Sequence, residues 1–189
     1  MTRFTQTEIP DVILIVPDLF EDNRGYFFES YNLQQFEEGV GDVHFLQDNE
    51  SRSAYGVLRG LHYQLAPFEQ AKLVRVVEGT VLDVAVDIRD GSPTYGQHVA
   101  FELSGENRHQ LYIPKGFAHG FITLSETAIF QYKVDNYYSE DCERGLRFDD
   151  PLLEIDWRND PEDIILTPKD RGLPFLSKKV DAPPAKSRY

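Results

Sequence analysis

The sequence is poor in several features that would define a class of protein. One cysteine, Cys142, is present among 189 residues, so no internal disulfide can form and we expect a reducing compartment. Its acidic neighbours Asp141 and Glu143 disfavour a reactive thiolate. No apolar run approaches the ~18 residues that span a bilayer, and residues 1–6 lack the apolar stretch of a secretory signal. We therefore expect a soluble, cytoplasmic protein.

Positive charge is also scarce. Lysines and arginines number 19 against 32 aspartates and glutamates, which gives a formal net charge of -13. Such an exterior repels nucleic acid and anionic membrane surfaces, so we expect neither as a partner. The length fits one domain, because domains commonly contain ~100 to 200 residues. We expect a single domain over 1–189, with its core at about 9–176 and a mobile tail at 181–189.

What the chain has in quantity is short apolar or alternating segments separated by turn residues. This pattern predicts a mainly β protein, a sandwich or barrel, with a few short helices. Alternation along 81–88 places Asp83 on the opposite face of a strand from Leu82 and Val84, toward either solvent or a polar pocket. The expected strands cover residues 12–16, 26–31, 43–47, 57–64, 73–77, 81–88, 98–103, 110–113, 117–123 and 128–134.

Other local signals fill in the connections. A helix is predicted over Leu33–Glu38, with Asn32 as N-cap, Gln35 as its reciprocal partner and Gly39 as terminator. Turn residues at 78–79, 90–93 and 104–107 predict hairpin loops. After about residue 149 the sequence becomes rich in proline and charge, with apolar anchors at 155–157 and 164–166. We expect this stretch to cover the barrel.

Two separated segments, 59–62 and 114–121, place His62 and His119 beside glycines in strand-like sequence. A glycine there usually marks a close approach of another group to the backbone. Lys72 begins one apolar strand and Tyr132 lies near the end of another. A base, cations and a phenol suit proton transfer next to a carbonyl in an anionic substrate.

Strand geometry constrains this group. Arg59 and His62 have opposite parity, so in a regular strand they point to opposite faces. Both can reach one pocket only if the strand is irregular, and Gly60 is the place where we expect a bulge.

Five motifs then occur in the order seen in dTDP-4-dehydrorhamnose 3,5-epimerases, and the chain resembles this family from about residue 9 to about residue 176. The resemblance implies a cupin-like jelly roll, a homodimer, no cofactor and a dTDP-sugar substrate. A strand at Val12–Val16 is our candidate for pairing across that dimer. The motifs are Arg24-Gly25-Tyr26-Phe27-Phe28-Glu29-Ser30-Tyr31, Gln47-Asp48-Asn49, Arg59-Gly60-Leu61-His62, Gly116-Phe117-Ala118-His119-Gly120-Phe121 and Asn136-Tyr137-Tyr138.

The resemblance also implies the roles of individual residues. The family epimerises carbons 3 and 5 of dTDP-4-dehydro-6-deoxy-D-glucose, giving dTDP-4-dehydro-L-rhamnose for dTDP-L-rhamnose biosynthesis. His62 matches the proton acceptor, Asp170 its carboxylate partner and Tyr132 the acid, while Lys72 matches the cation beside the ketone oxygen. Imidazole titrates near neutrality and a phenol is protonated at rest, so these types suit those roles. The expected substrate contacts are Arg24, Glu29, Gln47, Asp48, Asn49, Arg59, Lys72, His119, Tyr138, Glu143 and Lys169.

Three alternatives stay open at this stage. A cupin metalloenzyme needs about three or four clustered ligands, typically with a His-x-His pair, and the five histidines here are isolated in sequence, so we expect no metal. A non-catalytic sugar-nucleotide binding module would need neither base nor acid. A monoepimerase of a related dTDP-4-keto-deoxysugar pathway could carry both His62 and Tyr132, because sequence does not count the carbons that are inverted.

Overall fold

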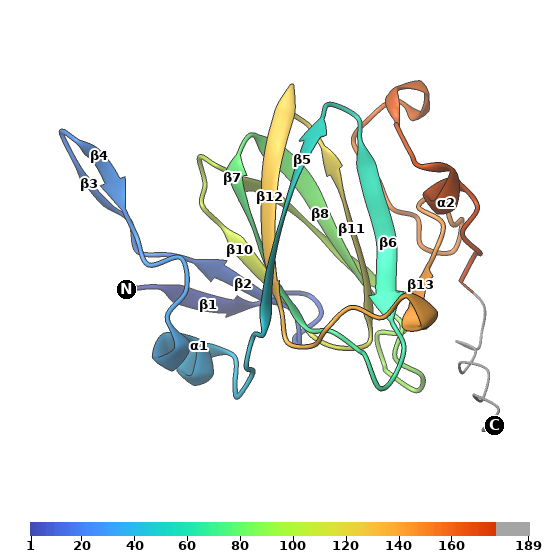
Figure 1. Cartoon of the computed structure of the whole chain (residues 1–189), viewed down its shortest axis with the longest axis horizontal. Helices are drawn as coiled ribbons and strands as arrows, with labels where there is room; N and C mark the ends of the chain where they lie inside the picture. Colours follow the sequence, from blue (N-terminus) through green and yellow to red (C-terminus); the bar gives the residue numbers. More distant parts are fainter. Residues whose placement is uncertain (177–189) are drawn as a thin grey trace.

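The computed structural model describes residues 1–176; the tail expected at 181–189 lies outside the described residues. Two antiparallel sheets form its framework (Figure 1). The larger sheet contains, in spatial order, β1 (Arg3–Gln6), β2 (Ile13–Val16), β10 (Gln110–Ile113), β7 (Lys72–Glu78), β12 (Thr127–Val134) and β5 (Gln47–Ala54). The smaller contains β13 (Glu143–Gly145), β6 (Leu58–Gln64), β11 (Phe117–Thr123), β8 (Thr80–Asp87) and β9 (His98–Ser104).

The main core lies between these two sheets. Val74 and Phe130 of the six-stranded sheet belong to the same buried cluster as Val81, Ala85 and Phe121 of the five-stranded sheet. The rings of Phe121 and Phe130 stack with centroids 4.1 Å apart, which joins the two layers. This architecture is a cupin-like jelly roll, as expected, and it is mainly β.

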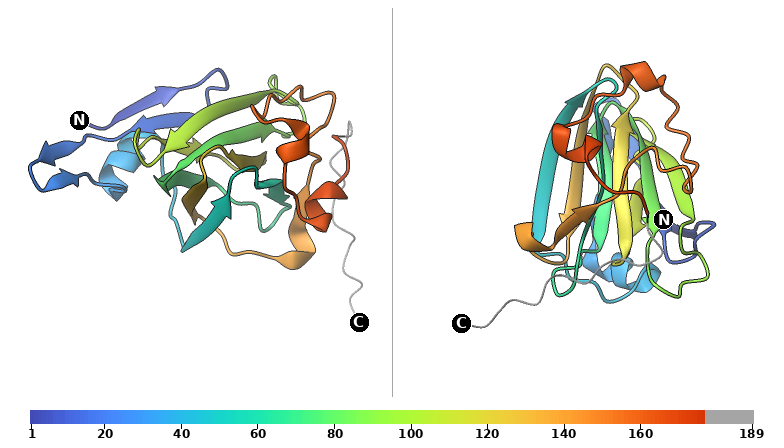
Figure 2. Two further views of the ribbon diagram at one scale, coloured as in Figure 1. Left: turned by 90° about the horizontal axis from the view of Figure 1, so that it is seen from above. Right: turned by 90° about the vertical axis from the view of Figure 1, so that its right-hand side faces the viewer.

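The outer face of the five-stranded sheet is covered by the C-terminal segment, drawn orange to red in Figures 1 and 2. Leu82 and Val84 pack there with Trp157 and Leu153, and the Trp157 indole N–H donates to the carbonyl of Phe148. This confirms the predicted cover and the predicted alternation along β8. The segment includes two short helical turns, η2 (Pro161–Asp163) and α2 (Pro168–Arg171).

The N-terminal part carries one helix and one projecting hairpin. Helix α1 (Leu33–Gly39) begins at Asn32, whose side chain accepts from the Gln35 amide, and Phe36 packs against the outer face of the six-stranded sheet. The reciprocal bond expected from the Gln35 side chain is wrong, because that side chain donates to Glu29. The hairpin of β3 (Phe20–Asp22) and β4 (Gly25–Phe27), which we call the arm, extends from one end of the body (Figures 1 and 2).

Several local predictions were wrong, because the pairing of distant strands decides where strands begin and end and which loops are hairpins. The segments 78–79 and 104–107 link strands of different sheets, so only 90–93 joins paired strands. The strand expected at 43–47 occurs instead at 47–54, and the one expected at 26–31 ends at Phe27. Strand β2 pairs with β1 on one side and β10 on the other, so it has no free edge for the dimer contact suggested for 12–16.

Within residues 1–176 no helix is long and apolar enough to cross a membrane.

Candidate active site

A cavity of about 600 Å³ lies between the two sheets and is closed on one side by the C-terminal segment. Both sheets contribute polar side chains to its lining, which also includes Phe121 and Phe130. Ten of the residues predicted from the sequence line it: Asn49, Arg59, His62, Lys72, His119, Tyr132, Tyr138, Glu143, Lys169 and Asp170.

His62 and Asp170 form a hydrogen-bonded pair in this cavity. Nε2 of His62 lies 2.7 Å from Oδ1 of Asp170, although the two residues are 108 positions apart. The His62 side chain is 31% exposed and that of Asp170 is 4% exposed. Because an ionised carboxylate only accepts, Nε2 carries the proton and Nδ1 presents a lone pair. The pair therefore has a base atom available on the accessible ring.

The C-terminal segment holds Asp170 in place. Thr167 caps α2, and its hydroxyl accepts from the Asp170 amide at 3.1 Å. Burial raises the pKa of the Asp170 carboxyl, but hydrogen bonds from His62, the Gly60 amide and Thr167 outweigh it and leave the pKa below its usual value. Asp170 is thus a fixed anion at the end of the imidazole.

The irregularity predicted at Gly60 is present, and it brings Arg59 and His62 to the same cavity. The register between β6 and β11 shifts between the pairs His119–His62 and Phe121–Arg59. Gly60 has a φ of +130°, and a Cβ there would lie 2.5 Å from the Cα of Gly120. A side chain at position 60 is therefore excluded by conformation and by space.

Lys72 lies at the centre of the polar lining. Its Nζ is 3.4 Å from Nδ1 of His119 and 3.4 Å from the carbonyl oxygen of His62. Burial lowers the pKa of Lys72 to about 8, against the opposing charges of Asp83 and Glu143. His119 donates from Nε2 to Oδ2 of Asp83 at 2.8 Å, and burial lowers its pKa too. The suggested partnership of Asp83 with His119 is confirmed as a contact.

Tyr132 faces His62 from the other sheet, since β12 belongs to the six-stranded sheet and β6 to the five-stranded sheet. Burial raises the pKa of the Tyr132 phenol, so the group stays protonated at neutral pH. Arg59 lies nearby, and its guanidinium donates to the Ser53 hydroxyl at 3.0 Å. The cavity thus has an imidazole on one wall and a phenol on the other.

The cavity rim is formed by a three-residue cluster of Tyr138, Glu143 and Lys169, which we call the rim cluster. The hydroxyl of Tyr138 and the ammonium of Lys169 both donate to Oε2 of Glu143. The hydrogen bond to Glu143 raises the pKa of Tyr138 to about 12. Two cavity residues that were not predicted from the sequence support the segment that carries Tyr138. Gln64 accepts from the Ser139 amide, and Gln70 donates to the Asn136 carbonyl. The sequence offered a signal only for Gln64, which lies two residues after His62 and therefore on the same face of the strand.

Four predicted substrate contacts lie outside this cavity. Arg24 is on the arm and pairs with Asp22, and Glu29 accepts from Gln35 beside α1. Gln47 donates to Asn49, one step from the lining. Asp48 points to the outer face of its sheet, where it pairs with Lys133 beside a separate hollow of about 250 Å³.

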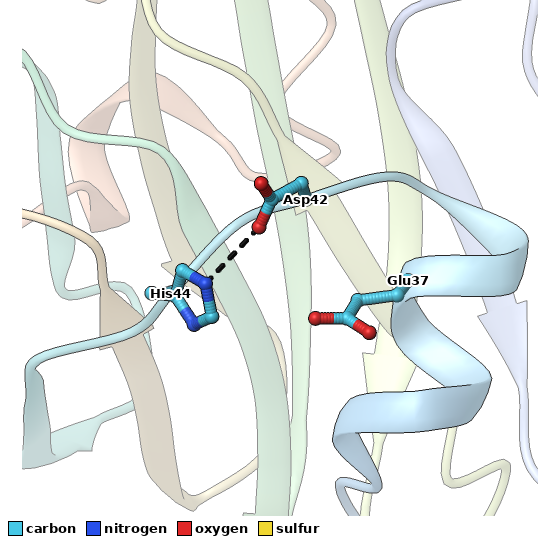
Figure 3. Close-up of side chains that lie close together, drawn as sticks. All are labelled: Glu37, Asp42 and His44. Carbon is cyan, nitrogen blue, oxygen red and sulfur yellow. Dashed lines mark ion pairs between the residues drawn. The ribbon is translucent and has the colours of Figure 1, made fainter.

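Potential metal ligands gather elsewhere in the described chain. Glu37, Asp42 and His44 offer atoms within 4.8 Å of one another, and Figure 3 shows the ion pair between Asp42 and His44. All three side chains are exposed, and they lie around the end of α1 rather than in the cavity. Exposed groups of this kind are common without a metal, so we assign no function to them.

Comparison with known proteins places this geometry in a family. The model of the dTDP-4-dehydrorhamnose 3,5-epimerase family matches residues 6–178. A protein of that name from Shigella flexneri is 57% identical over 153 residues, which cover 80% of this chain and 84% of the relative. The crystal structure of the epimerase from Legionella pneumophila in complex with dTDP-4-keto-L-rhamnose has a TM-score of 0.89 and 48% identity, covering 93% of both chains.

A more distant relative differs in its reaction. A dTDP-4-dehydrorhamnose 3-epimerase from Streptomyces niveus is 37% identical over 181 residues, covering 95% of this chain and 86% of the relative. The extent of the family match and the higher identity to the 3,5-epimerases decide the assignment. The chain belongs to the dTDP-4-dehydrorhamnose 3,5-epimerase family, whose members are isomerases.

Proposed function

We propose that this protein epimerises carbons 3 and 5 of dTDP-4-dehydro-6-deoxy-D-glucose to give dTDP-4-dehydro-L-rhamnose. The observation that carries the proposal is the placement of a carboxylate-paired histidine and a protonated phenol on opposite walls of one cavity. Inversion of a carbon requires proton removal from one face and proton delivery to the other.

In the proposed reaction Nδ1 of His62 takes the proton from a carbon next to the ketone. The electrons of that C–H bond form the enolate, whose oxygen accepts a hydrogen bond from the ammonium of Lys72. Tyr132 then donates its proton to the opposite face of the carbon, and the ketone re-forms. Asp170 stabilises the imidazolium between these steps. Solvent then takes the proton from His62 and returns one to Tyr132, after which the same residues act on the second carbon.

Binding of the nucleotide is proposed to depend on local positive charge in an otherwise acidic protein. Arg59, Lys72 and Lys169 line the cavity, and a diphosphate carries charge that such cations attract. Tyr138, a residue 54% exposed at the rim, offers the flat face of its ring for stacking on the base. We place the protein in the cytoplasm, in accord with a free, buried Cys142.

A homodimer would account for the two contacts that lie far from the cavity. The arm carries Arg24 and exposes Phe20 and Phe27, which are 59% and 65% exposed. We propose that the arm of each subunit reaches the cavity of its partner and supplies Arg24 there, together with Glu29, which follows the arm in sequence. The variants Arg24→Ala and His62→Ala, each inactive alone, would then complement each other in mixed dimers. Random subunit exchange makes half of the dimers mixed, and each mixed dimer has one intact site of two, so about a quarter of wild-type activity should return. Mixing that restores nothing would contradict the arm's role.

The reaction itself is tested with dTDP-4-keto-6-deoxyglucose in deuterated water, with the sugar protons followed by NMR. The wild type should place deuterium at carbons 3 and 5. His62→Ala should be inert and Tyr132→Phe should be impaired, whereas His44→Ala, an exposed histidine outside the cavity, should match the wild type. Deuterium at one carbon alone would indicate a monoepimerase. No exchange by the wild type would leave a binding module or another substrate.

A further inference from the structure

Asp83 is a fully buried carboxylate that the proposed reaction does not use. Its exposed fraction is 0%, and the neighbouring positions on its face of β8, Val81 and Ala85, belong to the apolar core between the sheets. Oδ2 accepts from His119, whereas Oδ1 has no hydrogen-bond partner among the described residues. A buried carboxylate that is only half satisfied destabilises a fold. Its presence beside the cavity therefore needs an explanation other than stability.

Hydrogen bonds connect Asp83 to Lys72 through His119. The imidazole bridges two groups: Nε2 lies 2.8 Å from Asp83, and Nδ1 lies 3.4 Å from Nζ of Lys72. Because the carboxylate accepts from Nε2, that atom carries the proton and Nδ1 keeps its lone pair. His119 is then a neutral ring that accepts from the Lys72 ammonium. Asp83 thereby fixes the tautomer that the lysine requires.

The charged and hydrogen-bonding groups around Lys72 come from the facing five-stranded sheet. Asp83 on β8 and Glu143 on β13 are the anions that favour its ammonium form, while its Nζ lies 3.4 Å from both the His119 imidazole on β11 and the backbone carbonyl of His62 on β6. Glu143 is already shared by two other donors at the rim. Of these two anions, Asp83 is therefore the one whose charge acts mainly on Lys72.

We propose that Asp83 is a positioning residue that acts through His119 to orient and stabilise the ammonium group of Lys72. This rests on the proposed function, in which that ammonium stabilises the enolate. The arrangement resembles the His62–Asp170 pair in form but differs in use, since one histidine accepts a proton from substrate and the other accepts a hydrogen bond from a cation.

The variant Asp83→Asn tests this with little change of shape. The amide oxygen still accepts from Nε2 of His119, but the negative charge is gone. For charges about 8 Å apart at an effective dielectric constant of about 20, the ammonium should then lose its proton about 1.5 pH units lower. Lys72 acts in its charged form, so the alkaline limb of the kcat profile should move to lower pH by that amount. At pH 8 kcat should fall about fifteenfold, and KM should change little.

Asp87→Asn is the matched control. Asp87 lies on the same strand, is also 0% exposed, and pairs with Arg89, Ser92 and Thr94 away from the cavity. Its substitution removes a buried charge and should lower thermal stability, yet it should leave the alkaline limb where the wild type has it. A merely structural role for Asp83 predicts that the two variants behave alike.

A titration that does not depend on turnover separates this proposal from the proposed function. The ε-carbon signal of Lys72, assigned by its absence in Lys72→Met, is followed by carbon-13 NMR against pH. We expect a midpoint near the pKa of about 8 in the wild type and one about 1.5 units lower in Asp83→Asn. Equal midpoints would overturn the role of Asp83, whether or not the wild type exchanges deuterium. Failed exchange with shifted midpoints would refute the proposed function alone.

Discussion

The rim cluster offers a prediction whose magnitude follows from its geometry. Tyr138 and Lys169 donate to the same oxygen of Glu143, so the carboxylate holds a ring and a cation at fixed positions before any substrate arrives. We predict that Tyr138→Phe and Glu143→Ala each raise KM for the dTDP-sugar, and that Tyr138→Phe leaves kcat nearly unchanged. The reason is that both changes free the Tyr138 ring, which is proposed to stack on the base, and neither touches the reacting carbons.

The size of the effect is set by exposure. A hydrogen bond to a charged group contributes about 1.5–3 kcal/mol when it is shielded from water. Tyr138 is 54% exposed and the Lys169 side chain is 57% exposed, so we discount the contribution to about 1 kcal/mol, or about a fivefold rise in KM. The assay is a double-mutant cycle in which KM is measured for both single variants and for the pair.

Because both substitutions remove one and the same hydrogen bond, the double variant should be no worse than the more affected single variant. This corresponds to a coupling free energy of about 1 kcal/mol. Additive effects, with a coupling below about 0.3 kcal/mol, would refute the reasoning and would mean that Tyr138 and Glu143 contact the substrate independently.

Three further changes probe the framework of the site. Asp170→Asn must keep its oxygen for the Gly60 amide and so presents its NH2 group to His62, which favours the tautomer with a protonated Nδ1. The deuterium-exchange rate should therefore fall by about 10²–10⁴ with the fold intact, and a loss below tenfold would contradict the pairing. Gly60→Ala combines a positive φ with a clash, and calorimetry should show a loss of more than about 2 kcal/mol, clearly exceeding that of Gly91→Ala, where the Cβ meets nothing within 4 Å. Thr167→Ala removes the cap of α2 and should lower stability by about 1 kcal/mol, an effect that Thr167→Ser should not reproduce.

The parts of the fold that were predictable from the sequence are those with apolar faces. Strands β7, β8, β10, β11 and β12 were found within one or two residues of their ends, since each buries at least one apolar side against another layer. Strand β5 was missed because its inward positions hold Gln47, Asn49 and Ser51. Two of these line the cavity, so a strand that faces a polar site lacks the alternation on which the prediction rests.

The site was predictable to different degrees for physical reasons. Strand parity around Gly60 indicated the bulge, because alternation is a local rule. No local rule places Asp170 at the His62 ring, since the contact joins a strand to a one-turn helix 108 residues away. Arg24 was identified only through the family motif, as its arm packs little surface against the body of the chain.

The jelly roll itself gives the proposed chemistry its direction. A substrate between two facing sheets has one wall on each side of the sugar ring, and the histidine and the phenol come from different walls. Neither group needs to move across the ring, because the fold separates removal and delivery of the proton in space. The cation proposed to stabilise the intermediate, Lys72, comes from β7, which neighbours the strand of the phenol, while its partner His119 comes from the sheet of the base. The two sheets must therefore keep their spacing for all three groups to act on one substrate, and the stacked pair Phe121–Phe130, which joins the sheets and lines the same cavity, helps to hold that spacing.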